Sequence, residues 1–478
     1  MIAIPSNLNW IQESVISYEG TTYGLIRVDH QKRLVVQGQT AGFEGEPGAD
    51  AHILLCPLNK TNAAALRARL PWLIPVPLGL RTSAGFGDRL GIATYGHIQA
   101  VKGTGVAPIL AQQSVRENTR TGRTPQGVMD DALWGVFEAG WRDPWGADAD
   151  HLKTLADIPP FVAAGYSFYT IDPSDYVDDG AESDSLETLR AKAARLPWDD
   201  LRSSLESSVE TYCRIFELGP IHLAFDESIL LRALVKYGAG VAHTARMAAA
   251  LTQALGDRPF ELEMSVDETN TTTSLFEHFY IASELKRLEV PFVSLAPRFV
   301  GHFEKGVDYI GDLNELDQNL RGHAAIMGHF GDSYKLSLHT GSDKFSVYPF
   351  AARHTKGRVH LKTAGTSYLE ALRLIATVEP SLFRRILRFA RERYDTDRKT
   401  YHVSALLERV PLAAALRDEQ LPALLDQFDA RQVLHVCFGS VLERFGNELY
   451  PLLKTYQSDY NLYLKRHFDR HLEAFAVR

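Results

Sequence analysis

Short runs of alternating apolar and polar residues recur along the chain and predict eight strands. Each run ends in small and polar residues, and most runs are followed by the three-to-four-residue apolar spacing of an amphipathic helix. The eight runs are residues 76–82, 107–114, 149–154, 166–173, 260–269, 292–298, 334–343 and 358–365. Strands that alternate with helices are typical of a parallel sheet, and eight such units are typical of a closed barrel. We therefore predict an α/β protein built on a (β/α)8 TIM-type barrel.

Three regions lie outside this strand–helix repeat. The first 70 residues alternate loosely and predict a β-rich N-terminal cap that ends in a short helix. Residues 174–258 interrupt the repeat after the fourth strand with an acidic stretch, charged helical positions and a long apolar helix. The last hundred residues or so have helical spacing almost throughout. These patterns predict a cap at 1–70, a barrel with its insertion at 71–376, and a helical C-terminal extension at 377–478.

The amino-acid composition argues against some classes of binding partner. The 478-residue chain is 45% hydrophobic and carries a net charge of -8, which argues against a nucleic-acid partner because phosphate binding requires a basic surface. Its three cysteines, at positions 56, 213 and 437, are too far apart in sequence to predict a disulfide framework or a cysteine-rich zinc site. The chain has no signal-peptide pattern and no apolar run long enough to span a membrane. We predict a cytoplasmic protein with no membrane partner.

Histidines recur at the ends of the predicted strands. The pair Asp150 and His151 lies in the third run, His302 follows the sixth, and His339 lies in the seventh. The carboxyl ends of barrel strands meet at one mouth, where such enzymes build their active sites. Three imidazoles with neighbouring carboxylates would suit a divalent cation such as zinc, iron, nickel, cobalt or manganese. The alternative is a set of unrelated polar residues, each satisfied locally.

Carboxylates of the fifth run are further candidates. Alternation places Glu263 and Asp267 on one face, opposite Leu262 and Met264. A carboxylate that faces a barrel interior costs several kcal/mol unless it is paired or bound to metal. A buried ion pair with Lys335, Lys153 or Lys362 is therefore the structural alternative. Glu268, at the strand end, is a reserve candidate.

Two features near the eighth run could bind an anion. Lys362 lies near the strand end, and Thr366 begins the helix that follows. Free N–H groups at that helix start would suit a carboxylate or phosphate, although an ordinary helix cap is the alternative. The glycine-rich stretch at 81–97 does not have the spacing and context of a dinucleotide-binding fingerprint.

Longer motifs carry a family resemblance. They are VDET (266–269), EHFYIASELKRL (277–288), FVSLAPRFVG (292–301), FEKGVDYIGDL (303–313), LHTGSDKFSVYP (338–349) and VHLKTAGTSYLEALR (359–373). These motifs resemble the tagaturonate epimerase family, also called tagaturonate/fructuronate epimerases, over residues from about 80 to 376. The resemblance implies a metal-dependent epimerase on a barrel related to divalent-metal aldolases. Its members interconvert D-tagaturonate and D-fructuronate in hexuronate breakdown.

The resemblance also implies roles for the candidate residues. Carried over by position, Asp150 and either Glu263 or Asp267 transfer protons, whereas His151, His302 and His339 bind the metal. Asp308 or a carboxylate of the fifth strand is the alternative third ligand to His302. The carboxylate of the substrate would be held by four candidates, namely Arg298, Lys344, Lys362 and Thr366.

The implied reaction constrains the mechanism. The inverted carbon lies β to the ketone, so simple enolisation does not make its C–H bond acidic, whereas retro-aldol cleavage and re-addition can invert it with metal assistance. The rival enzymes are a metal-dependent, class II-like sugar-acid aldolase and a ketose 4-epimerase acting on fructose and tagatose. A non-catalytic sugar-acid-binding protein is the rival outside enzymes. The expected partner is a small sugar acid, and the oligomeric state, including a homo-oligomer, is open.

Overall fold

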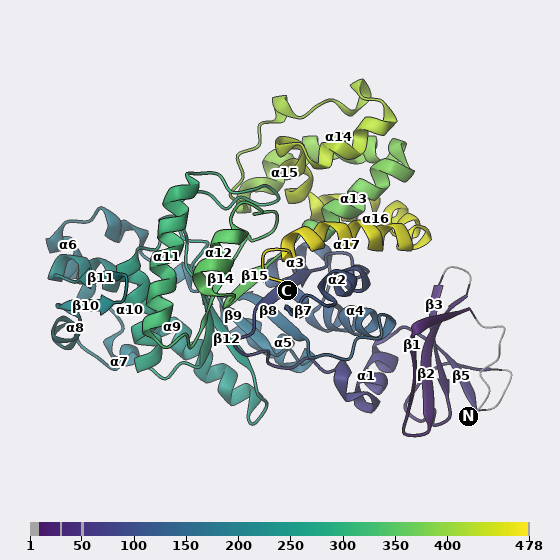
Figure 1. Cartoon of the computed structure of the whole chain (residues 1–478), viewed down its shortest axis with the longest axis horizontal. Helices are drawn as coiled ribbons and strands as arrows, with labels where there is room; N and C mark the ends of the chain where they lie inside the picture. The colour runs from purple at the N-terminus through teal and green to yellow at the C-terminus, as the bar shows by residue number, and fades with distance from the viewer. Residues whose placement is uncertain (1–8, 29–30, 49–51, 477–478) are drawn as a thin grey trace.

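A closed barrel of eight parallel strands forms the centre of the molecule (Figure 1). The computed structural model describes residues 9–28, 31–48 and 52–476. The barrel strands are β6 (Ser83–Gly87), β7 (Ala107–Ser114), β8 (Gly146–Leu152), β9 (Phe168–Ile171), β12 (Glu261–Ser265), β13 (Phe292–Ala296), β14 (Lys335–Leu338) and β15 (Val359–Lys362). Each strand pairs with the next in chain order, and β15 pairs with β6 to close the barrel. The predicted (β/α)8 fold is confirmed.

The first strand lies later in the chain than predicted. Residues 76–82 are not a strand, and β6 begins at Ser83. Pro77 cannot donate to a ladder, and Gly79 has φ +65° and donates its N–H to the carboxylate of Glu261 instead. Leu78 packs against Ile109 and Phe168. The strand predicted at 76–82 is therefore wrong, because only Leu78 of these residues is buried, and it packs against the barrel instead of pairing within it.

Helices cover the outside of the barrel, as the repeat predicted. They are α2 (Thr94–Val101), α3 (Val115–Thr121), α4 (Pro125–Glu138), α5 (Ile158–Ala164), α9 (Glu227–Leu255), α10 (Leu275–Arg287), α11 (Leu313–His329), α12 (Tyr348–Thr355) and α13 (Thr366–Val378). Local sequence explains their starts. Ser274 and Glu277 form a capping box at the start of α10, where each side chain accepts a backbone N–H of the other residue.

Two additions flank the barrel on opposite sides in Figure 1. The N-terminal sheet is antiparallel and consists of β1 (Trp10–Tyr18), β2 (Thr21–Val28), β3 (Gln31–Gln37), β5 (Ile53–Pro57) and β4 (Glu46–Pro47), followed by α1 (Lys60–Arg69). The other side carries the region after β9, with α6 (Leu186–Ala193), α7 (Trp198–Leu201), α8 (Leu205–Tyr212) and the hairpin of β10 (Ile215–Leu218) and β11 (Ile221–Ala224). The long apolar helix predicted at the end of that region is α9, which packs against α10 and α5.

The C-terminal extension is a helical layer above the barrel in Figure 1. It comprises α14 (Pro380–Asp397), α15 (Phe428–Val436), α16 (Phe438–Thr455) and α17 (Gln457–Leu472), joined by loops and short 3₁₀ helices. The last helix packs on α2 and α13, and α16 packs on α3, so the extension shares the core of the barrel domain. Within the described residues, no helix is long and apolar enough to cross a membrane.

Candidate active site at the barrel mouth

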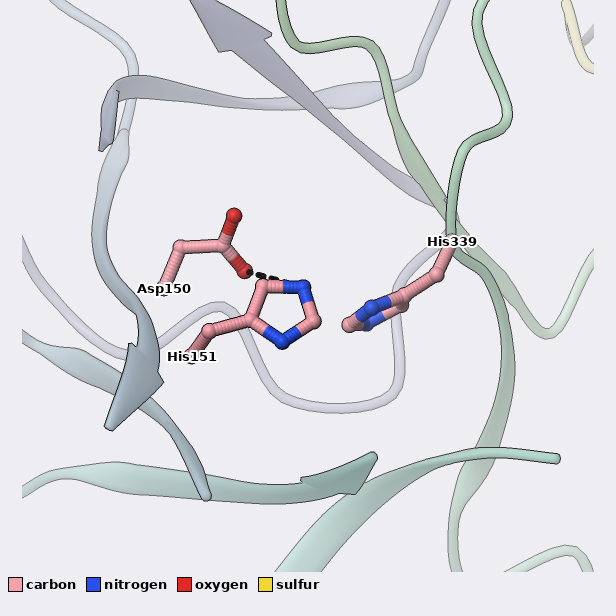
Figure 2. A group of neighbouring side chains, drawn as sticks. All are labelled: Asp150, His151 and His339. Atoms are coloured by element: carbon pink, nitrogen blue, oxygen red, sulfur yellow. Dashed lines mark ion pairs between the residues drawn. The ribbon is translucent and has the colours of Figure 1, made fainter. Parts of the chain in front are cut away.

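Side chains from four strands meet at the carboxyl-terminal mouth of the barrel. Asp150 and His151 come from β8, Glu263 from β12 and Lys362 from β15, and His339 directly follows β14. All except His151 are buried, and the side chain of His151 is only 12% exposed. In Figure 2 the carboxylate of Asp150 lies beside the ring of His151, and the ring of His339 faces that ring from the opposite wall. The two imidazole centroids are 5.1 Å apart.

Lys362 is the buried cation that balances this group. Its Nζ lies 2.8 Å from Asp148 Oδ2, 2.6 Å from Asp150 Oδ1 and 3.0 Å from Glu263 Oε1. Burial alone would raise the pKa of Glu263, but the charges of Lys362 and His339 outweigh it and lower that pKa well below its usual value. Asp148 is different, because burial raises its pKa to about 7 despite Lys362. The Lys362 ammonium therefore stabilises ionised Asp150 and Glu263 while Asp148 holds its proton more readily.

His151 reaches the site because β8 is irregular at its end. Its φ is +52°, and the pairing of β8 with β9 shifts register between Ala149 and Leu152. Such a bulge re-aims a side chain that would otherwise point to the opposite face from Asp150. The Nδ1 atom of His151 lies 3.0 Å from Asp172 Oδ2, which leaves Nε2 facing Asp150 Oδ1 at 3.8 Å. Burial lowers the pKa of His151, but the negative charges of Asp150 and its other acidic neighbours raise it to about 10.

His339 is held between two carboxylates. Its Nε2 lies 2.5 Å from Glu263 Oε1, and its Nδ1 lies 3.1 Å from Asp267 Oδ1 and 3.2 Å from the hydroxyl of Ser265. Burial and the Lys362 charge lower the pKa of His339, yet Asp267 and Glu263 outweigh them and raise it above its usual value. The pKa of Asp267 is correspondingly depressed, because the positive charge of His339 outweighs burial.

The donor set fits a divalent cation. Asp150, His151 and His339 each offer one ligand atom, and these atoms all lie within 4.8 Å of one another. Asp172 binds the far nitrogen of His151, which is the carboxylate–histidine arrangement that orients metal ligands in proteins. Glu263 Oε2 is buried without a hydrogen-bond partner among the residues that the structure describes. Two imidazoles with oxygen donors therefore form a group that could hold a metal.

A cavity of about 490 Å³ opens beside this group. Asp267, Glu268, His339, Lys305 and Tyr401 are among the residues that line it. A small hollow of about 20 Å³ lies between the cavity and the cluster and is lined by Asp150, His151, His339, Lys305 and Lys362, among others. A larger cavity, about 810 Å³, lies between the N-terminal sheet and the barrel, and no residue of the cluster lines it.

Four of the sequence-predicted residues lie outside the cluster. His302 and Arg298 line the cavity, and Arg298 donates to the backbone carbonyls of Asp267 and Thr269. Lys344 is fully buried, and its Nζ donates to the carbonyls of Glu304, Val307 and Ser342. Thr366 is also buried and donates to Asp343. The structure thus brings Asp150, His151, Glu263, Asp267, His339 and Lys362 together. Of the other four, His302 and Arg298 line the adjoining cavity, whereas Lys344 and Thr366 are buried with other partners.

Sequence reasoning missed several residues of this region. Asp148 precedes the predicted third strand by one residue, so a boundary error excluded it. Asp172 lay inside the predicted fourth strand and had no local signal of its own. Lys305 lies in the loop after β13, and Tyr401 belongs to the C-terminal extension, so no spacing in the sequence could place either beside the site. Only the position of Asp172 at a strand end could have identified it.

A second group of candidate ligands, Asp343 with His467 and His471, has a different character. Asp343 is paired with Arg431 at 2.9 Å and with His467 at 2.9 Å. Both nitrogens of His471 are used, because Nε2 accepts the N–H of Asp343 and Nδ1 faces the carbonyl of His467. These contacts fasten α17 and α15 to the loop after β14. None of these three residues lines any of the cavities described above, so we interpret the group as a structural ion-pair network.

Comparison with known proteins identifies the family. Residues 11–475 match the family model UxaE, tagaturonate epimerase. The chain is 41% identical over 471 residues to a tagaturonate/fructuronate epimerase of Thermotoga maritima, covering 97% of this chain and 96% of that one. A glycerol-complexed crystal structure of fructuronate-tagaturonate epimerase UxaE from Cohnella laeviribosi superposes with a TM-score of 0.93 at 36% identity, covering 98% of this chain and 96% of that one. The native crystal structure of the Cohnella enzyme gives the same TM-score and identity. The chain therefore belongs to the tagaturonate epimerase family, a family of isomerases.

Proposed function

We propose that this protein interconverts D-tagaturonate and D-fructuronate by a metal-dependent retro-aldol route. The observation that carries the proposal is the pair of facing imidazoles, His151 and His339, flanked by carboxylates at the mouth of the barrel. The relatives named for this activity match the chain over nearly its whole length, which supports the same substrates here.

His151 and His339 would hold the cation, with a neighbouring carboxylate as the oxygen donor. When bound, a divalent cation supplies Lewis-acid stabilisation of negative charge on the substrate oxygens. Asp172 keeps Nδ1 of His151 engaged so that Nε2 faces the site. Glu263 and Lys362 fix the position of His339 and of Asp150. These contacts orient the candidate ligands before substrate arrives.

Two carboxylates are available for proton transfer. Asp150 borders the small hollow, and Asp267 borders the cavity of about 490 Å³. One carboxylate accepts the proton of the hydroxyl on the inverted carbon as the adjacent carbon–carbon bond breaks and its electrons move towards the ketone. The aldehyde fragment turns, the same bond reforms on its other face, and the carboxyl group that took the proton in the first step returns it to the new alkoxide. Every atom of the substrate is retained, and the product differs from the substrate only in the configuration at one carbon.

Replacing His339 tests the proposal. We expect His339→Ala to lose both bound metal, measured by elemental analysis, and conversion of D-fructuronate, measured by NMR, because Nε2 and Nδ1 both face the cluster. His354→Ala is the matched control, since His354 pairs with Asp317 outside the site. A folded His339→Ala protein with unchanged metal content and activity would contradict the assignment. Accumulation of three-carbon products in the wild-type protein would identify an aldolase instead.

A further inference from the structure

We propose that Lys305 holds the carboxylate of the sugar-acid substrate and thereby selects hexuronates over neutral ketoses, an inference that rests on the proposed function. Lys305 is half-buried in the loop after β13. It lines both the cavity of about 490 Å³ and the small hollow next to the candidate metal ligands. Its Nζ donates to Thr340 Oγ1 at 2.8 Å, which places the ammonium beside the residue that follows His339.

The ammonium of Lys305 is not paired with a carboxylate of the described residues, so its charge is available to bind an anion. Across residues 9–28, 31–48 and 52–476, no carboxylate oxygen lies within 4.0 Å of its Nζ. Asp267 and Glu268 sense its charge, because Lys305 helps to lower the pKa values of both carboxyl groups. Its ammonium can therefore donate hydrogen bonds to the substrate carboxylate without first breaking an ion pair.

The other cations near the site are already engaged. Lys362 is bound by three carboxylates, and Lys344 is enclosed by backbone carbonyls. Arg116 pairs with Glu268 at 2.9 Å. Arg298 lines the cavity but donates to the carbonyls of residues 267 and 269. Lys305 alone among these five reaches both the cavity and the hollow at the candidate metal ligands.

The loop that carries Lys305 is fixed in place from behind. The buried Lys344 Nζ donates to the carbonyl of Glu304 at 2.8 Å and also to that of Val307, which bracket Lys305. Arg431 donates to the carbonyl of Gly306, and Gln432 donates to Glu304 Oε2 at 2.8 Å. A group that is already ordered loses less entropy when it binds a ligand, so this clamp favours tight binding.

The position also suits the proposed reaction. After retro-aldol cleavage the carboxylate belongs to the aldehyde fragment, and the ketone end belongs to the other fragment. An anchor at Lys305 therefore holds the aldehyde fragment by its far end while its reacting carbon turns. Loss of the anchor should weaken substrate binding and also allow fragments to escape.

The experiment compares Lys305→Met and Lys305→Arg with the wild-type protein and with Lys102→Met, a change at an exposed residue that directly follows α2. Calorimetry gives the Kd of D-fructuronate for the metal-free protein, and NMR gives KM and any three-carbon products for the metal-loaded enzyme. D-Fructose, which has a hydroxymethyl group in place of the carboxylate, serves as a competing ligand. Thermal melting establishes that each variant is folded.

We expect Lys305→Met to raise the Kd and KM for D-fructuronate by about 10- to 100-fold, the usual effect of a charge-assisted hydrogen bond. Lys305→Arg should recover part of this loss, and the inhibition constant of D-fructose should change less than about twofold. Three-carbon products should increase in Lys305→Met.

A change of less than twofold in the Kd and KM for D-fructuronate, or an equal change in the inhibition constant of D-fructose, would overturn the role of Lys305. Failure of wild-type protein to convert D-fructuronate while Lys305→Met still weakens its binding would overturn only the proposed function. Failure of wild-type protein both to convert and to bind D-fructuronate would overturn both.

Discussion

At the scale of single residues, His151 owes its orientation to Asp172. The hydrogen bond between His151 Nδ1 and Asp172 fixes which nitrogen faces the site. Asp172→Asn keeps the shape but removes the charge, so we expect the affinity for a divalent metal to fall by about tenfold. The pKa of His151 should fall as well, because Asp172 helps to raise it. Isothermal titration with metal and NMR titration of the imidazole measure these two effects.

The matched control for this change is Asp175→Asn. Asp175 lies three residues further on, is 67% exposed as a side chain, and pairs with Lys153 at 3.2 Å. We expect no change in metal affinity there. Equal metal affinities for wild type and Asp172→Asn would show that Asp172 has no role in orienting His151.

Lys344 should give the protein a distinctive pH dependence. Burial lowers the pKa of its ammonium from 10.5 to about 7, and the nearby Asp343 only partly opposes this. Between these two pH values the unfolded chain binds a proton that the folded chain lacks, so the contribution of Lys344 to stability rises with pH and is least favourable below pH 7.

A comparison with Lys344→Met isolates that contribution. Relative to this variant, the free energy of unfolding of the wild-type protein should rise by about 4 kcal/mol at most between pH 7 and 10.5, since each pKa unit corresponds to 1.36 kcal/mol. Denaturant unfolding at several pH values measures both proteins, and groups common to them cancel in the difference. If the free energies of unfolding of the two proteins changed in parallel with pH, the lowered pKa assigned to Lys344 would be contradicted.

The sequence could identify candidate site residues where they lie at the ends of predicted strands. The pairing of Asp150 with His151 and the location of His339 were visible because both lie at strand ends. The buried ion pair between Glu263 and Lys362 was foreseen as the structural alternative, and the structure contains it. The left-handed conformation of His151 was not predictable, because it depends on a register shift between two strands that only the closed barrel defines.

At the scale of elements, a buried ion pair connects the C-terminal helices to the barrel. Arg431 of α15 pairs with Asp343, in the loop after β14, and their side chains are only 8% and 5% exposed. Removing one partner of a buried pair leaves an uncompensated charge, so Arg431→Met should lower the free energy of unfolding by about 3 kcal/mol.

An exposed arginine of the same extension provides the comparison. Arg385 of α14 pairs with Glu448 at 2.7 Å, but the two side chains are 48% and 46% exposed. Arg385→Met should therefore cost less than about 1 kcal/mol. Urea denaturation of both variants tests the contrast, and equal losses would mean that the Arg431 contact does not fasten the loop.

Element prediction succeeded where apolar periodicity was strong and failed where composition misled. The run at 76–82 is apolar enough for a strand, but its proline and left-handed glycine prevent pairing. The true strand β6, of sequence SAGFG, is rich in small residues that have little β propensity, and so it was passed over. Strand β7 was predicted with its observed ends because its apolar run, APILA, ends in the polar residues QQS.

At the scale of the whole molecule, the site is completed by parts that are far apart in sequence. Residues 400–403 of the C-terminal extension line the cavity at the barrel mouth. Arg116, from the segment after β7, lies over the ring of Tyr401 at 4.9 Å and donates to the carbonyl of Thr400. The sequence predicted a helical layer here, but the contact between it and the mouth depends on tertiary packing that no local pattern encodes. The domain boundaries and the oligomeric state stay predictions.

The most direct measurement of the central claim is one incubation followed by NMR. Wild-type protein, first stripped of metal and then supplied with a series of divalent cations, is given D-fructuronate in D₂O. The account predicts metal-dependent formation of D-tagaturonate with no deuterium at the inverted carbon, because retro-aldol chemistry breaks a carbon–carbon bond and leaves that C–H bond intact. Deuterium at the inverted carbon, or no D-tagaturonate with any cation from folded protein, would contradict it.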